Sequence, residues 1–190
     1  MRYFKTSAFL VFFLLTARVN YAQSLPKEQS VTSIFKLNFF LPGVSYEQKL
    51  ATYETIYFNG YMDVLINSTG VNGTNQAHVF FTPTLDVEIR NYYNLNKRER
   101  LGRRTAMNSG NYLAPVYYGR YSQVSDFEDR EWINQVGAVW GMQRNARQGF
   151  SLDLSFGLSY TFDSKSYDYY NPVGVIAQLT LGFWLGKRPE

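Results

Sequence analysis

Cysteine is absent from the 190 residues of this chain. That absence excludes a disulfide framework, a thiolate metal site and the lipid-modified cysteine of a lipoprotein. Histidine is almost absent as well, because His78 is the only one. No long apolar run follows Leu15, and a membrane-spanning helix needs about 20 apolar residues, so a helical membrane protein is also excluded.

The first 22 residues have the parts of a secretory signal peptide. Arg2 and Lys5 make the start basic, residues 8–15 are an apolar run, and the small Ala22 stands at the end. This arrangement predicts export and cleavage after Ala22. The formal net charge is +4, and loss of Arg2, Lys5 and Arg18 lowers it to +1. The basic balance therefore belongs mostly to the leader and gives no reason to expect a nucleic-acid partner.

Apolar and polar residues alternate strictly in the C-terminal half. Within residues 150–162 every second residue is apolar, and residues 173–185 repeat the pattern with Ile176 and Trp184 as exceptions. A period of two places the two sets on opposite faces of a strand. Both runs are long enough for a tilted strand that crosses a membrane, which needs about 9–11 residues.

Weaker alternation predicts six more strands before these two. They cover residues 35–41, 44–50, 56–66, 79–89, 112–121 and 132–144. Pro83 falls inside one of them, and because proline cannot donate to the ladder, we expect a bulge or distortion there. Pro42 and Gly43 predict a tight turn between the first two strands.

The connections alternate between long and short. Polar segments at 67–77, 122–131 and 163–172 follow the third, fifth and seventh strands, so all three fall at one rim. Outer-membrane barrels have longer loops outside than on the periplasmic side. The tight Pro42–Gly43 turn and the long periplasmic connection at 94–110 depart from that rule.

The predicted fold is all-β, a closed up-and-down antiparallel transmembrane β-barrel of eight strands after a cleaved signal peptide. It divides the chain into a signal peptide (1–22), a short N-terminal segment (23–32), the outer-membrane barrel (33–187) and a C-terminal tail (188–190).

Residues 83–93 and the basic turn after them, with residues 109–113, 137–143 and 149–157, resemble small Gram-negative outer-membrane barrels of the OmpA/OmpX-like type. The resemblance covers roughly residues 33–187. It implies outer-membrane lipid as surroundings, and the barrel-assembly and periplasmic chaperone machinery as partners. Many such barrels end in an aromatic residue, whereas this chain ends in Glu190, so Phe183 in the last strand would have to supply the insertion signal.

Charged residues on the polar faces of the strands are the first candidate site. They are Lys36, Glu47, Lys49, Asp63, Asp86, Glu88, Arg90 and Asp153. A barrel of eight strands has room for side chains and little else, so we expect these groups to form a packed interior network. An ion or proton path is the functional alternative.

A basic cluster and an acidic rim are the other candidates. Lys97, Arg98, Arg100, Arg103 and Arg104 suit contact with anionic lipid, with a solvated turn as the alternative. Asp126, Glu128, Asp129, Tyr167, Tyr169 and Tyr170 suit contact with an unknown surface ligand, with solvated loops as the alternative. Their spacing matches no calcium loop.

No catalytic signature is present. The sequence has no G-x-S-x-G elbow, and His78 has no defined partner. We expect no enzyme, no cofactor and no metal, and instead a structural, surface-interaction or adhesive role in the outer membrane. The alternatives are a soluble periplasmic lipocalin-like barrel that binds a small hydrophobic ligand and, third, a lipid-modifying enzyme.

Overall fold

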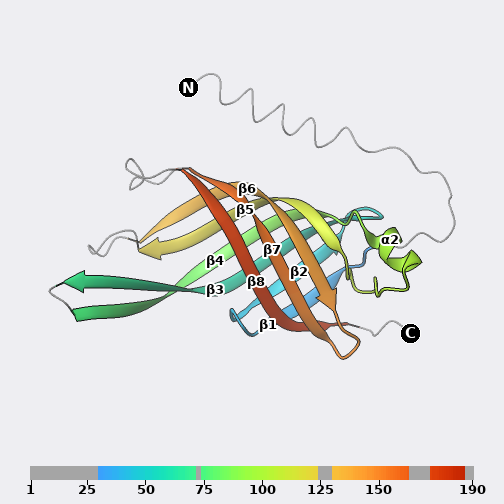
Figure 1. Cartoon of the computed structure of the whole chain (residues 1–190), viewed down its shortest axis with the longest axis horizontal. Helices are drawn as coiled ribbons and strands as arrows, with labels where there is room; N and C mark the ends of the chain where they lie inside the picture. The colour runs from blue at the N-terminus through green and yellow to red at the C-terminus, as the bar shows by residue number, and fades with distance from the viewer. Residues whose placement is uncertain (1–29, 72–73, 124–129, 163–171, 187–190) are drawn as a thin grey trace, which may run out of the picture.

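Eight antiparallel strands close into a barrel in the computed structural model, which describes residues 30–71, 74–123, 130–162 and 172–186. The strands are β1 (Ile34–Asn38), β2 (Gly43–Lys49), β3 (Glu54–Val71), β4 (Thr74–Asn91), β5 (Asn111–Gln123), β6 (Arg130–Asn145), β7 (Phe150–Phe162) and β8 (Val173–Leu185). Each strand pairs with the next along the chain, and β8 pairs with β1 (Figure 1). The predicted eight-stranded, up-and-down ring is confirmed.

The alternation in the sequence sets which side chains point inward. Along β7 the buried residues are Ser151, Asp153, Ser155, Ser159 and Thr161, whereas the apolar residues between them face outward. A strand directs successive side chains to opposite faces, so one sequence pattern makes one polar and one apolar face. In β8 the exceptions Ile176 and Trp184 lie inside with the polar set.

The long central hairpin continues through the segment that we predicted to be a loop. β3 and β4 pair from Glu54↔Asn91 to Val71↔Thr74 in one unbroken register, which includes Met62↔Pro83. The prediction of a bulge at Pro83 is therefore wrong for the pairing between β4 and β3. Pairing of β4 with β5 starts at Thr84, next to the proline, so Pro83 lies where β4 has only one partner. Beyond that point the hairpin projects from the barrel (Figure 1).

One end of the barrel, here the capped end, is covered by residues 92–110 together with residues 30–33. This connection contains α2 (Leu95–Arg100), the only helix among the described residues. It is too short to span a membrane. The Asn108 amide donates to Thr32 O and accepts from Thr32 N, each at 2.8 Å. Asn108 holds a left-handed φ of 58°, which asparagine tolerates. These bonds tie the chain before β1 to the connection before β5.

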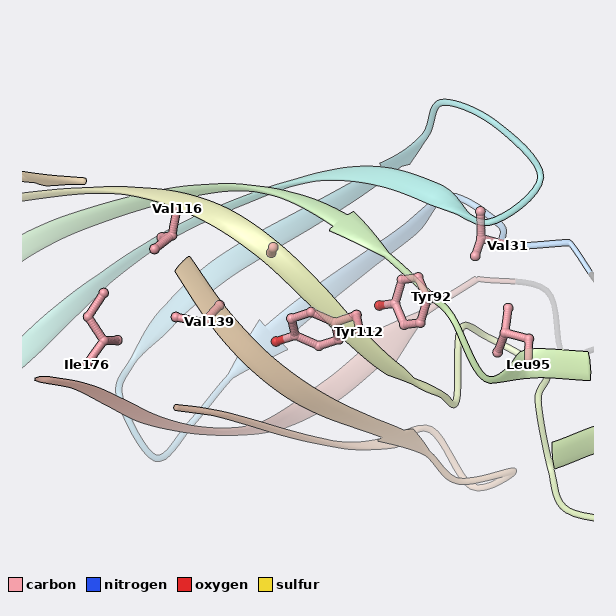
Figure 2. Packing of buried hydrophobic residues seen from close by; sticks show 8 residues of the cluster. Val31, Tyr92, Leu95, Tyr112, Val116, Val139 and Ile176 are labelled. Carbon is pink, nitrogen blue, oxygen red and sulfur yellow. The ribbon is translucent and has the colours of Figure 1, made fainter. Parts of the chain in front are cut away.

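Buried hydrophobic residues form a column inside the ring. Figure 2 shows Val116, Val139 and Ile176 deep in the barrel, then Tyr112 and Tyr92, and finally Val31 and Leu95 under the cap. Tyr92 and Tyr112 contact each other with ring centroids 5.5 Å apart. The column is thin, and among the described residues buried polar side chains outnumber buried hydrophobic ones.

The opposite end, here the open end, holds the far ends of β3 to β8. The predicted signal peptide and C-terminal tail, and most of the predicted rim loops, lie outside the described residues.

Candidate functional site in the barrel interior

Arg90 stands at the centre of a buried charge cluster near the capped end. Its Nε lies 2.7 Å from Glu88 Oε2, and its Nη1 lies 2.6 Å from Asp153 Oδ2. The guanidinium stacks between two rings, 3.5 Å from the Tyr57 centroid and 4.2 Å from the Tyr112 centroid. With 1% of its surface exposed, Arg90 is fully withdrawn from water. Ion pairs and cation–π contacts together replace its hydration.

Lys36 and Glu47 extend the cluster across the barrel. Lys36 Nζ lies 3.7 Å from Glu47 Oε2 and 3.8 Å from Asp153 Oδ2. Glu47 accepts hydrogen bonds from Thr55 Oγ1 and Tyr92 OH, both at 2.8 Å. Each carboxylate oxygen therefore has polar partners, as a buried charge requires.

Gln143 joins the two halves of this cluster. Its Oε1 accepts from Arg90 Nη1 at 2.9 Å and from Lys36 Nζ, and its Nε2 donates to Glu47 Oε2 at 3.1 Å. Tyr112 OH donates to Asp153 Oδ1 at 2.7 Å. The result is one continuous network that occupies the cross-section of the barrel.

A second buried polar group lies nearer the open end, around Asp86. The hydrogen-bond partners of this carboxylate are uncharged amides. Asp86 Oδ2 accepts from Asn59 Nδ2 at 3.1 Å and from Gln178 Nε2 at 2.9 Å. Asp86 Oδ1 is buried and has no hydrogen-bond partner among the described residues. Asn38 Nδ2 donates to Asn59 Oδ1 at 3.1 Å, which connects β1 to the same group.

Two of the predicted interior charges lie elsewhere. Lys49 follows the alternation of the inward-facing Ser45 and Glu47, but it is the last residue of β2 and lies at the end of the barrel. It is therefore exposed, and its Nζ donates to Ser30 Oγ at 2.5 Å. Asp63 is half-buried near the open end, where its Oδ2 lies 3.2 Å from Arg120 Nη2. The other six predicted residues, namely Lys36, Glu47, Asp86, Glu88, Arg90 and Asp153, are buried in the interior.

The basic cluster of the cap divides into two groups. Arg98 donates to Arg104 O from Nε and Nη2, and Arg104 Nε donates to Asn145 O at 2.6 Å, so both side chains hold the connection together. Partial burial and the nearby Arg103 lower the pKa of Arg98, and partial burial and Arg147 lower the pKa of Arg104. Lys97, Arg100 and Arg103 are exposed.

The remaining candidates lie outside the described side chains. Asp126, Glu128, Asp129, Tyr167, Tyr169 and Tyr170 fall in undescribed segments, and for His78 only the backbone is described, paired with Asn67 in β3. No group of three or more histidine or acidic side chains in the described ranges is arranged to hold a metal ion.

Sequence reasoning missed five members of the network: Thr55, Tyr57, Tyr92, Tyr112 and Gln143. A signal existed for Tyr57, because it shares the parity of Asn59 and so had to face inward with it. Tyrosine also suits lipid-facing and loop positions, so its presence in a strand does not by itself mark a member of the network. Its hydroxyl needs a partner once it is buried, and the interior carboxylates are the partners available.

Comparison with known proteins adds no family assignment: no family model, no curated protein and no solved structure matches this chain.

Proposed function

We propose that this protein is a small integral outer-membrane β-barrel with a structural or surface-interaction role. The observation that carries the proposal is the inverted distribution of polarity. The charged residues Lys36, Glu47, Glu88 and Arg90 are buried, whereas large apolar side chains cover the outside. A barrel in water would need the opposite arrangement, because exposed apolar surface favours association.

The outer apolar surface runs along every strand. Its members include Leu37, Phe58, Val64, Phe81, Leu85, Leu113, Trp140, Leu154, Phe156, Leu158, Val175 and Phe183. β5, β7 and β8 each have 13 residues, which exceeds the 9–11 or so that a tilted membrane strand needs. The surface and the strand lengths together suit a bilayer core.

Aromatic residues with polar tips stand on the outer surface toward both ends. Toward the capped end Tyr93, which follows β4, accepts a hydrogen bond at its OH from Trp140 Nε1 at 2.8 Å. Toward the open end the Tyr121 and Trp132 rings contact each other with centroids 5.5 Å apart. Tyrosine and tryptophan favour the boundary between hydrocarbon and water, so these two pairs support a spanning orientation.

The polar network also weighs against the lipocalin-like alternative. A carrier of hydrophobic ligands needs an apolar interior, and here the section around Arg90 is filled by ionic and hydrogen-bonded side chains. The same filling favours a structural role over conduction through the barrel.

The direct test uses the full chain expressed in a Gram-negative host. We expect the protein in the outer-membrane fraction, with a gel mobility that changes on boiling, because closed barrels resist unfolding in detergent. Recovery as a soluble periplasmic protein would overturn the proposal.

A charge placed on the outer face sharpens that test. Phe156→Arg lies mid-strand on β7, and for a spanning barrel it should cost about 2–4 kcal/mol of folding free energy in vesicles. Gln148→Arg in the exposed β6–β7 turn is the matched control and should change the free energy by less than about 0.5 kcal/mol. Equal effects of the two substitutions would mean that the outer face does not meet lipid.

A further inference from the structure

The wall of the barrel is incomplete between the tip of the β1–β2 hairpin and the open end. β1 pairs with β8 only from Phe35↔Leu185 to Asn38↔Gly182, and the last bond on this edge is Phe39 N to Leu181 O at 2.9 Å. Within the described residues, the edge of β8 at 174–180 that faces away from β7 has no further strand partner.

The facing edge of β3 is open at the same place. Pairing with β2 stops at Gly43↔Tyr61, and Met62 N donates to Pro42 O at 3.0 Å. Figure 1 shows the short β1–β2 hairpin turning back while β3 and β8 continue toward the open end. The two strands therefore border a lateral gap whose lower edge is the hairpin tip.

A cavity of about 330 Å³ lies at this gap. Its lining has an apolar part, which includes Leu41, Val175 and Leu179, and a polar part formed by Tyr61, Asp63, Tyr118, Arg120, Gln135 and Gln178. Of the apolar set, Val175 is 65% exposed and faces the outer surface, whereas Ile176 and Gln178 of the same strand face the lumen. The cavity thus joins the outer surface to the upper lumen through the wall.

The polar part retains hydrogen-bonding capacity. Arg120 Nη2 pairs with Asp63 Oδ2 at 3.2 Å, but Arg120 Nε is buried and has no hydrogen-bond partner among the described residues. The Tyr61 and Tyr118 hydroxyls bond to each other beside it. Arg120 lines the cavity and its side chain is 28% exposed, so its guanidinium can also meet an oxyanion there. Charge-assisted hydrogen bonds of this kind are the stronger ones.

The open edges indicate what kind of molecule must occupy the gap. Unpaired backbone N–H and C=O groups in hydrocarbon cost several kcal/mol each, so lipid tails alone do not satisfy them. A polar head group in the gap, with the water around it, can bond to these edges, while an attached chain lies on the outer face over Val175 and Leu179. We propose that the lateral gap admits one single-chain amphiphile with an oxyanion head from the surrounding membrane, with its head at Arg120 and its chain along β8. This inference rests on the proposed membrane location.

The test uses the full chain folded into phosphatidylcholine vesicles that contain a trace of a fatty acid with a photoactivatable diazirine near its carboxylate. After irradiation, peptide mass spectrometry locates the labelled residues. Outward-facing residues near the membrane boundary, such as Trp132, report insertion, whereas the inward-facing Ile176 and Tyr118 report entry through the gap. If the fatty acid enters through the gap, both the outward-facing and the inward-facing residues should be labelled.

Two matched substitutions separate the gap from the intact wall. Ala177 and Ala138 are both exposed on the outer face, but Ala177 lines the cavity and Ala138 is paired on both sides, with Pro115 and Leu158. Ala177→Trp should lower labelling of Ile176 and Tyr118 about tenfold, and Ala138→Trp should leave it unchanged. Arg120→Gln should lower inward labelling, and Asp63→Asn should raise it, since Asp63 competes for the guanidinium.

The outcomes separate the two proposals. Outward labelling without inward labelling, or equal effects of the two tryptophans, overturns the amphiphile site and leaves the membrane barrel standing. Absence of labelling on both faces of a folded protein overturns the membrane barrel itself.

Discussion

Near the capped end each strand has a partner on both sides, whereas toward the open end β3 and β8 each have one partner among the described residues. The interiors differ in the same sense. Around Arg90 the side chains are fully buried and linked by charge, whereas Arg120 and Asp63 are partly exposed and line a cavity. The comparison indicates that closure of the wall and filling of the lumen go together, because buried charges are stable only where ion pairs and hydrogen bonds replace their hydration.

The two halves of the barrel should differ most in the free energy of unfolding that is lost when each half loses its arginine. Arg90→Met leaves Glu88 and Asp153 buried without their main cation and should lower the free energy of unfolding by about 3–5 kcal/mol. Arg120→Met breaks a pair whose side chains are 28% and 18% exposed, and should cost about 1 kcal/mol or less. Urea unfolding in vesicles, followed by gel mobility, measures both values.

A control for this pair removes the charges together. Arg90→Met combined with Asp153→Asn should be less harmful than the sum of the two single changes, because the double variant leaves fewer unpaired charges. Similar costs for Arg90→Met and Arg120→Met would contradict the distinction between the two halves.

An intermediate difference in stability is expected between alanine substitutions at two glycines, one packed against the network and one in open space. A Cβ at Gly141 would lie 2.0 Å from Tyr112 Cζ, so Gly141→Ala forces the ring away from Asp153 and should cost about 1–3 kcal/mol. A Cβ at Gly60, beside the end of the β2 pairing, meets nothing within 4 Å, so Gly60→Ala should be neutral or stabilise by about 0.5 kcal/mol. The same urea titration compares them, and a harmless Gly141→Ala would show that the network repacks freely.

The smallest effect on stability should come from the outside of the cap. Changing Lys97, Arg100 and Arg103 to glutamine should alter the free energy of unfolding by less than about 0.5 kcal/mol, because all three are exposed. If the turn contacts anionic lipid, the same variant should lose the preference for vesicles that contain phosphatidylglycerol, as measured by co-flotation. An unchanged preference would favour the solvated turn.

The control for that variant lies within the same segment. Arg98→Gln with Arg104→Gln removes the bonds to Arg104 O and Asn145 O, so it should speed hydrogen exchange across residues 92–110. A loosened cap with unchanged lipid preference would separate the two roles of the basic cluster.

Some of the site could be predicted and some could not. The inward position of Asp86, Glu88, Arg90 and Asp153 follows from parity alone, because a strand has a period of two. The exposure of Lys49 could not be predicted in this way, since parity does not tell where a strand leaves the barrel.

The number of strands, their order and the polar face of most of them follow from the sequence, because these depend on local alternation and on turns. That Arg90 meets Asp153 from β7 and lies between the rings of Tyr57 and Tyr112 follows from the three-dimensional structure alone, since those contacts depend on register around the ring. The three-dimensional structure also fixes where the wall opens. The short β1–β2 hairpin is visible in the sequence, but its consequence depends on how far β3 and β8 continue past it.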